Sequence, residues 1–170
     1  DEAGNIIPGS GRDLNRPEVS WPSGFNNLYT NSVRAHQLSG ILIKNIDIRE
    51  AIVKAKINNL YPQIFVTSFA CLNGKTIHLP QFPVLVTQNR KKDWSYDNIG
   101  LLGDVFENYS KLGLSQLKRY KCEKRFTKLQ SWRILHDKKK PFKQIANIFA
   151  ISFHKNTSVP GHLMFPFYLS

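Results

Sequence analysis

The fold prediction rests on residues 64–79, which read IFVTSFACLNGKTIHL. Ile64 to Leu72 is rich in β-branched and aromatic side chains, a composition typical of strands. The Asn73-Gly74 dipeptide supplies the two positive φ angles that a type I′ turn needs. The pattern therefore predicts a β-hairpin in which Lys75 to Leu79 is the returning strand.

Two more segments are predicted to extend this sheet. Phe82, Val84 and Val86 alternate after the hairpin and predict a third strand, so that residues 64–87 form one antiparallel unit. Residues 145–153 are a nearly unbroken apolar run, which predicts a buried central strand.

Helical spacing is found on both sides of the predicted hairpin. Residues 48–59 place isoleucines and alanines on one helical face, although alternation over 53–57 would also suit a strand. Apolar residues at spacings of three and four predict a helix of about four turns ending before Gly113, and Ser115 can cap a second helix. The period of residues 126–135 suits a helix, while their composition suits a strand.

These elements predict one α+β domain, a mostly antiparallel sheet covered by two helices, with extended arms at both ends. A length of 170 residues and a hydrophobic content of 41% suit a single packed domain. Residues 1–38 are predicted to form an N-terminal arm, and residues 39–158 the globular domain. Residues 159–170 are an apolar C-terminal segment whose two prolines and one glycine exclude a regular helix.

Positive charge is concentrated in residues 111–143. This segment holds twelve of the 24 Lys and Arg residues but only two acids, in a chain of net charge +12. Such a concentration opposes folding through self-repulsion and is typical of a surface that meets a polyanion. Phe142 is a candidate for stacking on bases or for membrane insertion. The candidate polyanion-binding residues are Lys118, Arg119, Lys121, Lys124, Arg125, Lys128, Lys138, Lys139, Lys140 and Lys143.

The sequence leaves three kinds of contact with a polyanion as alternatives. The predominance of lysine favours phosphates over base edges. The order of helix, turn and basic helix at 97–125 matches the outline of a helix-turn-helix, so a nucleic-acid-binding regulator is an alternative. A cluster of about four to eight basic residues also suffices for adsorption to an anionic membrane.

Catalytic patterns are weak in this sequence. It has neither a phosphate-binding glycine-rich motif nor a nucleophile elbow, and its histidines are isolated. Asp104, Glu107 and Lys111 share one helical surface and could form a Mg²⁺-dependent nuclease site. A second loose nuclease pattern consists of His136, Asn147, His154 and Asn156. We expect no enzyme, no catalytic residue, no metal, no cofactor and no small-molecule substrate, with the nuclease as a further alternative.

Cys71 and Cys122 stand far apart and belong to no C-x-x-C pair. Two free thiols in an intracellular, reducing compartment are therefore expected. No apolar run reaches the length of a membrane span.

The order of hairpin unit, helix, basic segment and strand, together with the size, the basic balance and the polar N-terminal arm, resembles the matrix proteins of rhabdoviruses, especially the short ones of plant members. The resemblance implies a non-enzymatic, virion-associated protein that self-associates as a homo-oligomer. It also implies that the protein bridges a ribonucleoprotein and a lipid envelope. The leading expectation is thus a structural protein whose basic face binds a phosphate-rich polyanion, either nucleic acid or an anionic membrane.

Overall fold

The structure is a computed structural model, and it describes residues 17–36, 40–44, 47–81, 98–131 and 141–169. Within these ranges the fold is mostly helical, with seven α-helices, one 3₁₀-helix and a single two-stranded sheet. The predicted α+β fold is therefore wrong. The elements are β1 (Val19–Trp21), α1 (Phe25–Asn31), η1 (Ser32–His36), α2 (Ile48–Ala55), α3 (Pro62–Asn73), β2 (Thr76–His78), α4 (Asn98–Ser110), α5 (Gln116–Leu129), α7 (Pro141–Ser152) and α8 (Val159–Leu169).

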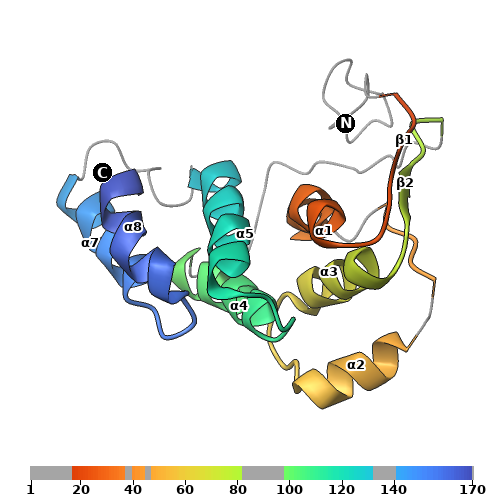
Figure 1. Cartoon of the computed structure of the whole chain (residues 1–170). Helices are drawn as coiled ribbons and strands as arrows, with labels where there is room; N and C mark the ends of the chain where they lie inside the picture. The colour runs from red at the N-terminus through yellow and green to blue at the C-terminus, as the bar shows by residue number, and fades with distance from the viewer. Residues whose placement is uncertain (1–16, 37–39, 45–46, 82–97, 132–140, 170) are drawn as a thin grey trace, which may run out of the picture.

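Helices α4 and α5 form the centre of the molecule. The helices α1 and α3 and the small sheet lie on one side of this pair, and α7 and α8 lie on the other (Figure 1). Helix α2 packs against α3. The two strands are antiparallel and far apart in sequence, with Val19 opposite His78 and Trp21 opposite Thr76.

The predicted hairpin is mainly a helix, because residues 64–72 belong to α3. Its buried positions, Ile64, Phe65, Ser68 and Cys71, recur at helical spacing. Pro62 stands in the first turn, where its missing N–H leaves no hydrogen bond unmade. The Gly74 N–H donates to the Ala70 carbonyl at 2.8 Å with extended backbone at Gly74, so the Asn-Gly pair ends a helix instead of forming a turn between strands.

The predicted central strand at residues 145–153 is also wrong, because residues 141–152 form α7. Ile148 and Ile151 are buried, whereas Phe149 and Phe153 are exposed. The run is unbroken because both the inner and the outer side of this helix carry apolar residues, which hides the helical period. The predicted third strand at 82–86 lies outside the described residues.

Both predicted arms contain segments that pack into the core. Leu28, Val33 and Ala35 in α1 and η1 are buried, although they fall in the expected N-terminal arm. The C-terminal segment forms the helix α8, contrary to prediction. Pro160 is the second residue of α8, where proline is tolerated, and Phe165 is completely buried.

Three helices lie near their predicted positions. The predicted 48–59 helix is α2, which ends at Ala55, and Lys56 follows with a positive φ of 52°. Helix α4 and helix α5 are joined by a turn in which Gly113 adopts a φ of 66°, a conformation that favours glycine. Residues 126–129, ambiguous by sequence, belong to α5.

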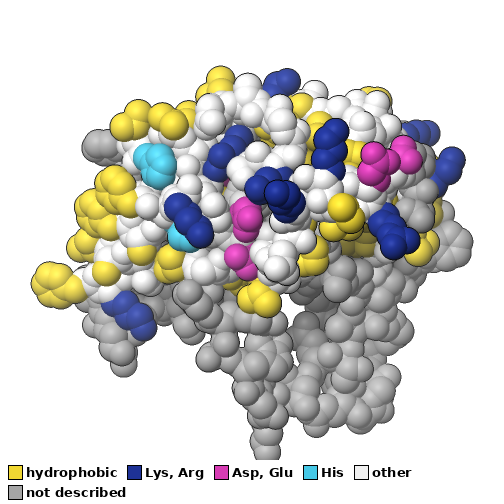
Figure 2. Space-filling model, turned by 90° about the horizontal axis from the view of Figure 1, so that it is seen from below, with side chains coloured by type: hydrophobic (Ala, Val, Ile, Leu, Met, Phe, Trp, Pro, Cys, Tyr) yellow, Lys and Arg dark blue, Asp and Glu magenta, His cyan; other side chains and the backbone are white. Residues whose placement is uncertain are grey.

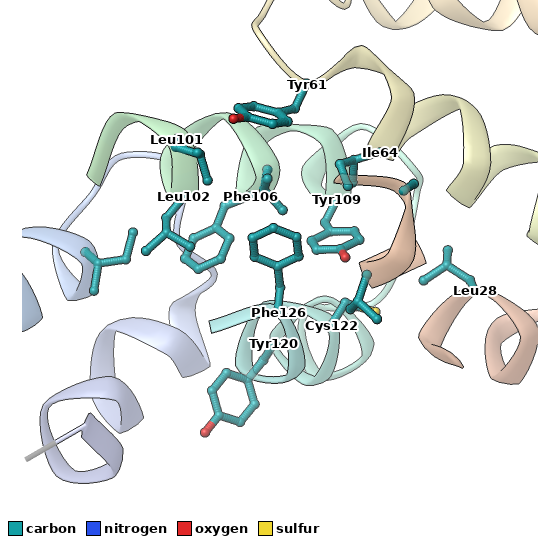
Figure 3. Close-up of a cluster of buried hydrophobic side chains, with 14 of the residues drawn as sticks. Leu28, Tyr61, Ile64, Leu101, Leu102, Phe106, Tyr109, Tyr120, Cys122 and Phe126 are labelled. Atoms are coloured by element: carbon teal, nitrogen blue, oxygen red, sulfur yellow. The ribbon is translucent and has the colours of Figure 1, made fainter. Parts of the chain in front are cut away.

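The hydrophobic core lies where α4, α5 and α8 meet. Phe106, Tyr109 and Phe126 are completely or almost completely buried between α4 and α5, as Figure 3 shows. The ring of Phe165 from α8 lies 5.8 Å from Phe106, centroid to centroid. On the far side, Ile64 of α3 and residues of α1 extend the same cluster.

Thiol labelling tests this core directly. Cys71 and Cys122 are free and buried, and burial raises the pKa of both thiols, that of Cys122 to about 12. Since the thiolate is the reactive form, we expect neither cysteine to react with a disulfide reagent at mildly alkaline pH in the folded protein. Both should react after unfolding in urea. Rapid labelling of either thiol in the absence of denaturant would contradict this packing.

Candidate polyanion-binding surface

Helix α5 presents a basic face toward solvent. Lys118, Lys121 and Lys128 are exposed, and Lys124 and Arg125 are partly exposed. Their spacings of three and four residues place them along one side of the helix, over a rise of about 15 Å. The opposite side carries buried residues of the core. We call Lys118, Lys121, Lys124, Arg125 and Lys128 the α5 basic face.

Two aromatic rings of α1 contact two residues of this face, Lys118 and Arg125. The Lys118 ammonium lies 5.4 Å from the centroid of the Phe25 ring, and the Arg125 guanidinium carbon lies 4.6 Å from that of Tyr29. Phe25 and Tyr29 are one helical turn apart in α1, and their rings adjoin at 6.0 Å. Cation–π contacts of this kind fix the positions of two otherwise flexible side chains. Helix α1 is thus a second component of the surface.

Arg119 does not belong to the α5 basic face, although the sequence placed it there. Its side chain is only 13% exposed, and its Nε donates to the Glu123 carboxylate at 2.7 Å. The same guanidinium also donates to the Asn156 carbonyl. Arg119 therefore connects α5 to the turn between α7 and α8.

Glu123 is the only acid of α5, and it is completely buried. It accepts hydrogen bonds from the Ser158 hydroxyl at 2.6 Å and from the Ser158 N–H, just before α8 begins. Gly161 leaves room for this contact, because a Cβ there would meet Thr157 at 2.6 Å and Glu123 at 3.1 Å. Burial raises the pKa of the Glu123 carboxyl, and Ser158 and Arg119 oppose the shift. Because its carboxylate points inward to Ser158, Glu123 does not lie on the solvent side of α5 with the α5 basic face.

The remaining predicted binding residues lie elsewhere. Lys143 and Phe142 are exposed on α7, a separate helix that packs against α4 and α8. The residues 138–140 lie outside the described part of the chain. Figure 2 shows Lys and Arg side chains spread over the face seen from below, together with acids. The basic residues of the 111–143 segment therefore do not all share one side, and the α5 basic face is the group that the structure brings together.

The proposed nuclease carboxylates hold the turn before α3 in place. Asp104 accepts a hydrogen bond from the Leu60 N–H at 3.1 Å, and Glu107 accepts one from the Asn59 side chain at 3.4 Å. Both acids therefore have roles in joining α4 to this turn, which offers a structural reason for their spacing.

The second nuclease pattern also has structural contacts. His154 accepts a hydrogen bond from the Asn156 N–H at 3.2 Å, and the Asn156 amide donates to the Gly103 carbonyl at 3.2 Å. The His154 ring packs so closely on Gly103 that a Cβ there would lie 2.3 Å from it. These residues fix the turn between α7 and α8 against α4, while His136 lies outside the described residues. Among the described residues, no group of three or more His, Cys, Asp or Glu side chains could hold a metal ion.

Comparison of the chain with protein-family models, with curated proteins and with solved structures gives no significant match. In the described part of the chain, no helix has both the length and the apolar character that a membrane crossing requires.

Proposed function

We propose that this protein binds nucleic acid without sequence selectivity, through contacts between the α5 basic face and successive backbone phosphates. The observation that carries the proposal is the alignment of five cations on one helical side whose only neighbouring acid on the helix, Glu123, is buried. Lysine and arginine neutralise phosphates and release condensed counterions, which supplies affinity that does not depend on base sequence.

The shape of the surface favours a nucleic acid strand over a lipid leaflet as its partner. The cations follow a single helix and form a narrow row, and Phe25 and Tyr29 hold Lys118 and Arg125 at its edge. A narrow row of charges suits a line of phosphates, whereas adsorption to lipid tolerates a broad and irregular patch. The prominence of lysine also suits phosphates, because its ammonium is a point charge without the planar fork that reads base edges.

Two earlier expectations do not contribute to this proposal. The resemblance to rhabdovirus matrix proteins stays a prediction, and two segments on which it rests, residues 64–72 of the hairpin unit and most of the strand at 145–153, are helical here. Self-association also stays a prediction, because residues 1–16 of the arm that suggested it lie outside the described residues.

The two free, buried thiols support an intracellular, reducing location as part of the proposal.

The salt dependence of RNA binding tests the proposal. The probe is a fluorescently labelled single-stranded RNA without secondary structure, titrated between about 50 and 200 mM salt, the range in which phosphate contacts lose most affinity. Replacing Lys118, Lys121 and Lys128 together by glutamine should lower the slope of log K against log salt by about 2, at about 0.7 per lost contact. It should weaken binding at the lowest salt by more than tenfold.

A second triple variant separates the surface from net charge. Lys54, Lys56 and Lys75 are exposed lysines outside α5, and their replacement by glutamine changes the net charge by the same amount. We expect this control to retain at least half of the affinity. Equal losses in both variants, or no RNA binding by the wild type, would exclude the α5 basic face as the site. Strong preference for one duplex sequence would favour the helix-turn-helix regulator.

A further inference from the structure

Helix α7 carries apolar side chains on its solvent side. Phe142 is 86% exposed and Phe153 is 66% exposed, while Ile145 and Phe149 are each about half exposed. Spacings of three and four residues place Phe142, Ile145 and Phe149 along one side of α7. Phe153 directly follows the last residue of α7, and its N–H donates to the Phe149 carbonyl at 2.9 Å. The rings of Phe149 and Phe153 are stacked, with centroids 6.1 Å apart and an interplanar angle of 6°.

Helix α8 continues this apolar surface. Val159, Leu163 and Met164 are all exposed to a similar degree. The two helices pack against each other, and the Phe153 ring stacks on His162 of α8 at 6.4 Å. Figure 2 shows hydrophobic side chains gathered at the left edge, the side on which α7 and α8 lie in Figure 1. We call Phe142, Ile145, Phe149, Phe153, Val159, Leu163 and Met164 the α7–α8 apolar surface.

An apolar surface of this extent indicates a binding partner. Soluble proteins rarely expose large side chains contiguously, because each exposed ring forgoes the transfer free energy of burial. The core side of the same helices is already occupied, since Ile148, Ile151 and Phe165 are buried. Repacking of α7 against α8 would therefore not cover the outer side.

Charge decides which partner suits this surface. Residues 141–170 contain no Asp or Glu, and Lys143 and Lys155 are exposed beside the apolar side chains. A second copy of the chain would bring the same positive charge to the contact, and the two would repel. An anionic partner with an apolar interior fits both properties. A membrane leaflet that contains anionic lipid has this combination, with phosphates at the level of the lysines and acyl chains beneath them.

We propose that the α7–α8 apolar surface inserts into the headgroup–acyl boundary of an anionic membrane leaflet, while Lys143 and Lys155 contact lipid phosphates. The helices lie in the plane of the interface and do not cross the bilayer. This binding site goes beyond the proposed nucleic acid contact, because it uses other helices and a different chemical property, apolar insertion. The two sites can therefore succeed or fail independently.

Flotation of the full chain with vesicles tests the proposal. One set of vesicles contains phosphatidylcholine alone, and the other contains phosphatidylcholine mixed with phosphatidylserine. We expect recovery with the mixed vesicles and little with the neutral ones. Phe142→Glu should lower the partition coefficient by about tenfold or more, since burial of one Phe ring supplies at least that factor.

Leu42→Glu is the matched control. Leu42 is 98% exposed and lies outside α7 and α8, and its replacement changes the net charge equally. It should leave the partition coefficient within about twofold, as expected for an exposed residue outside the contact. Phe142→Ser, which introduces no charge, should also reduce recovery. The far-UV circular dichroism and RNA affinity of the Phe142 variants should match those of the wild type, which separates this site from the α5 basic face.

Three results would overturn the lipid site. One is the absence of binding to the mixed vesicles, and another is an equal loss in Phe142→Glu and Leu42→Glu. The third is a dimer in sedimentation that Phe142→Glu dissociates while the vesicle partition coefficient stays unchanged. In that case the α7–α8 apolar surface would hold a second copy of the chain.

Discussion

Replacement of Phe165 by alanine is expected to lower the free energy of unfolding by about 3–5 kcal/mol. The Phe165 side chain is completely buried, and its ring lies 5.8 Å from Phe106 and 5.7 Å from Tyr120. It is thus the residue through which α8 packs against both α4 and α5. Truncation removes the apolar contact and leaves a cavity between three helices that relax only in part. Urea denaturation followed by circular dichroism measures the effect.

The neighbouring residue provides the control for this change. Met164 lies in the same helix and is 48% exposed, so Met164→Ala should reduce the free energy of unfolding by less than about 1 kcal/mol. A small effect of Phe165→Ala, or equal effects of the two replacements, would mean that α8 does not dock through Phe165.

The helices that sequence analysis predicted correctly have one apolar and one polar side. In α4, the completely buried residues Leu102, Phe106 and Tyr109 recur at helical spacing, and in α5 the charged residues show the same period. A helix at the boundary between core and solvent displays its period in the sequence. The row of lysine and arginine residues that forms the α5 basic face was predictable for this reason.

The segments that were predicted wrongly lack this contrast. Helix α3 is rich in β-branched and aromatic residues, yet its packing against α1, η1, α2 and α4 outweighs the weak intrinsic preference of such residues for strands. In α7 the outer side is apolar as well, so the run was indistinguishable from a buried strand. The exposed apolar side chains on the outer side of α7 led to the wrong strand prediction, and the same side chains support the proposed lipid site.

Contacts between segments that are far apart in the chain could not be predicted from the sequence. Phe25 and Tyr29 lie about ninety residues before the cations that they orient, and no periodicity links them. A local signal for the inward position of Arg119 did exist, because Glu123 follows it by four residues, the spacing of a helical ion pair. The partner Ser158 became apparent only from the fold.

Glu123→Ala is expected to destabilise the protein by about 3–5 kcal/mol, the range for breaking a buried ion pair. The carboxylate is completely buried, and it receives hydrogen bonds from Arg119 and from both the N–H and the hydroxyl of Ser158. Its removal leaves the Arg119 guanidinium largely buried without its anion and leaves donors at the start of α8 without an acceptor. Denaturation in urea measures the loss. Glu50→Ala, which removes an exposed carboxylate from α2, should change stability by less than about 0.5 kcal/mol.

A double-mutant cycle divides the effect of Glu123 between its two partners. If the ion pair dominates, Arg119→Ala in the Glu123→Ala background should cost much less than in the wild type, with a coupling energy of about 1–3 kcal/mol. Glu123→Gln keeps an oxygen that can accept from Ser158 but loses the charge, so it should lie between the wild type and Glu123→Ala. Additive effects of the two alanine replacements would assign the role of Glu123 to the Ser158 contact alone. In that case α5 would be joined to α8 by hydrogen bonds from Ser158, with Arg119 contributing independently through the Asn156 carbonyl.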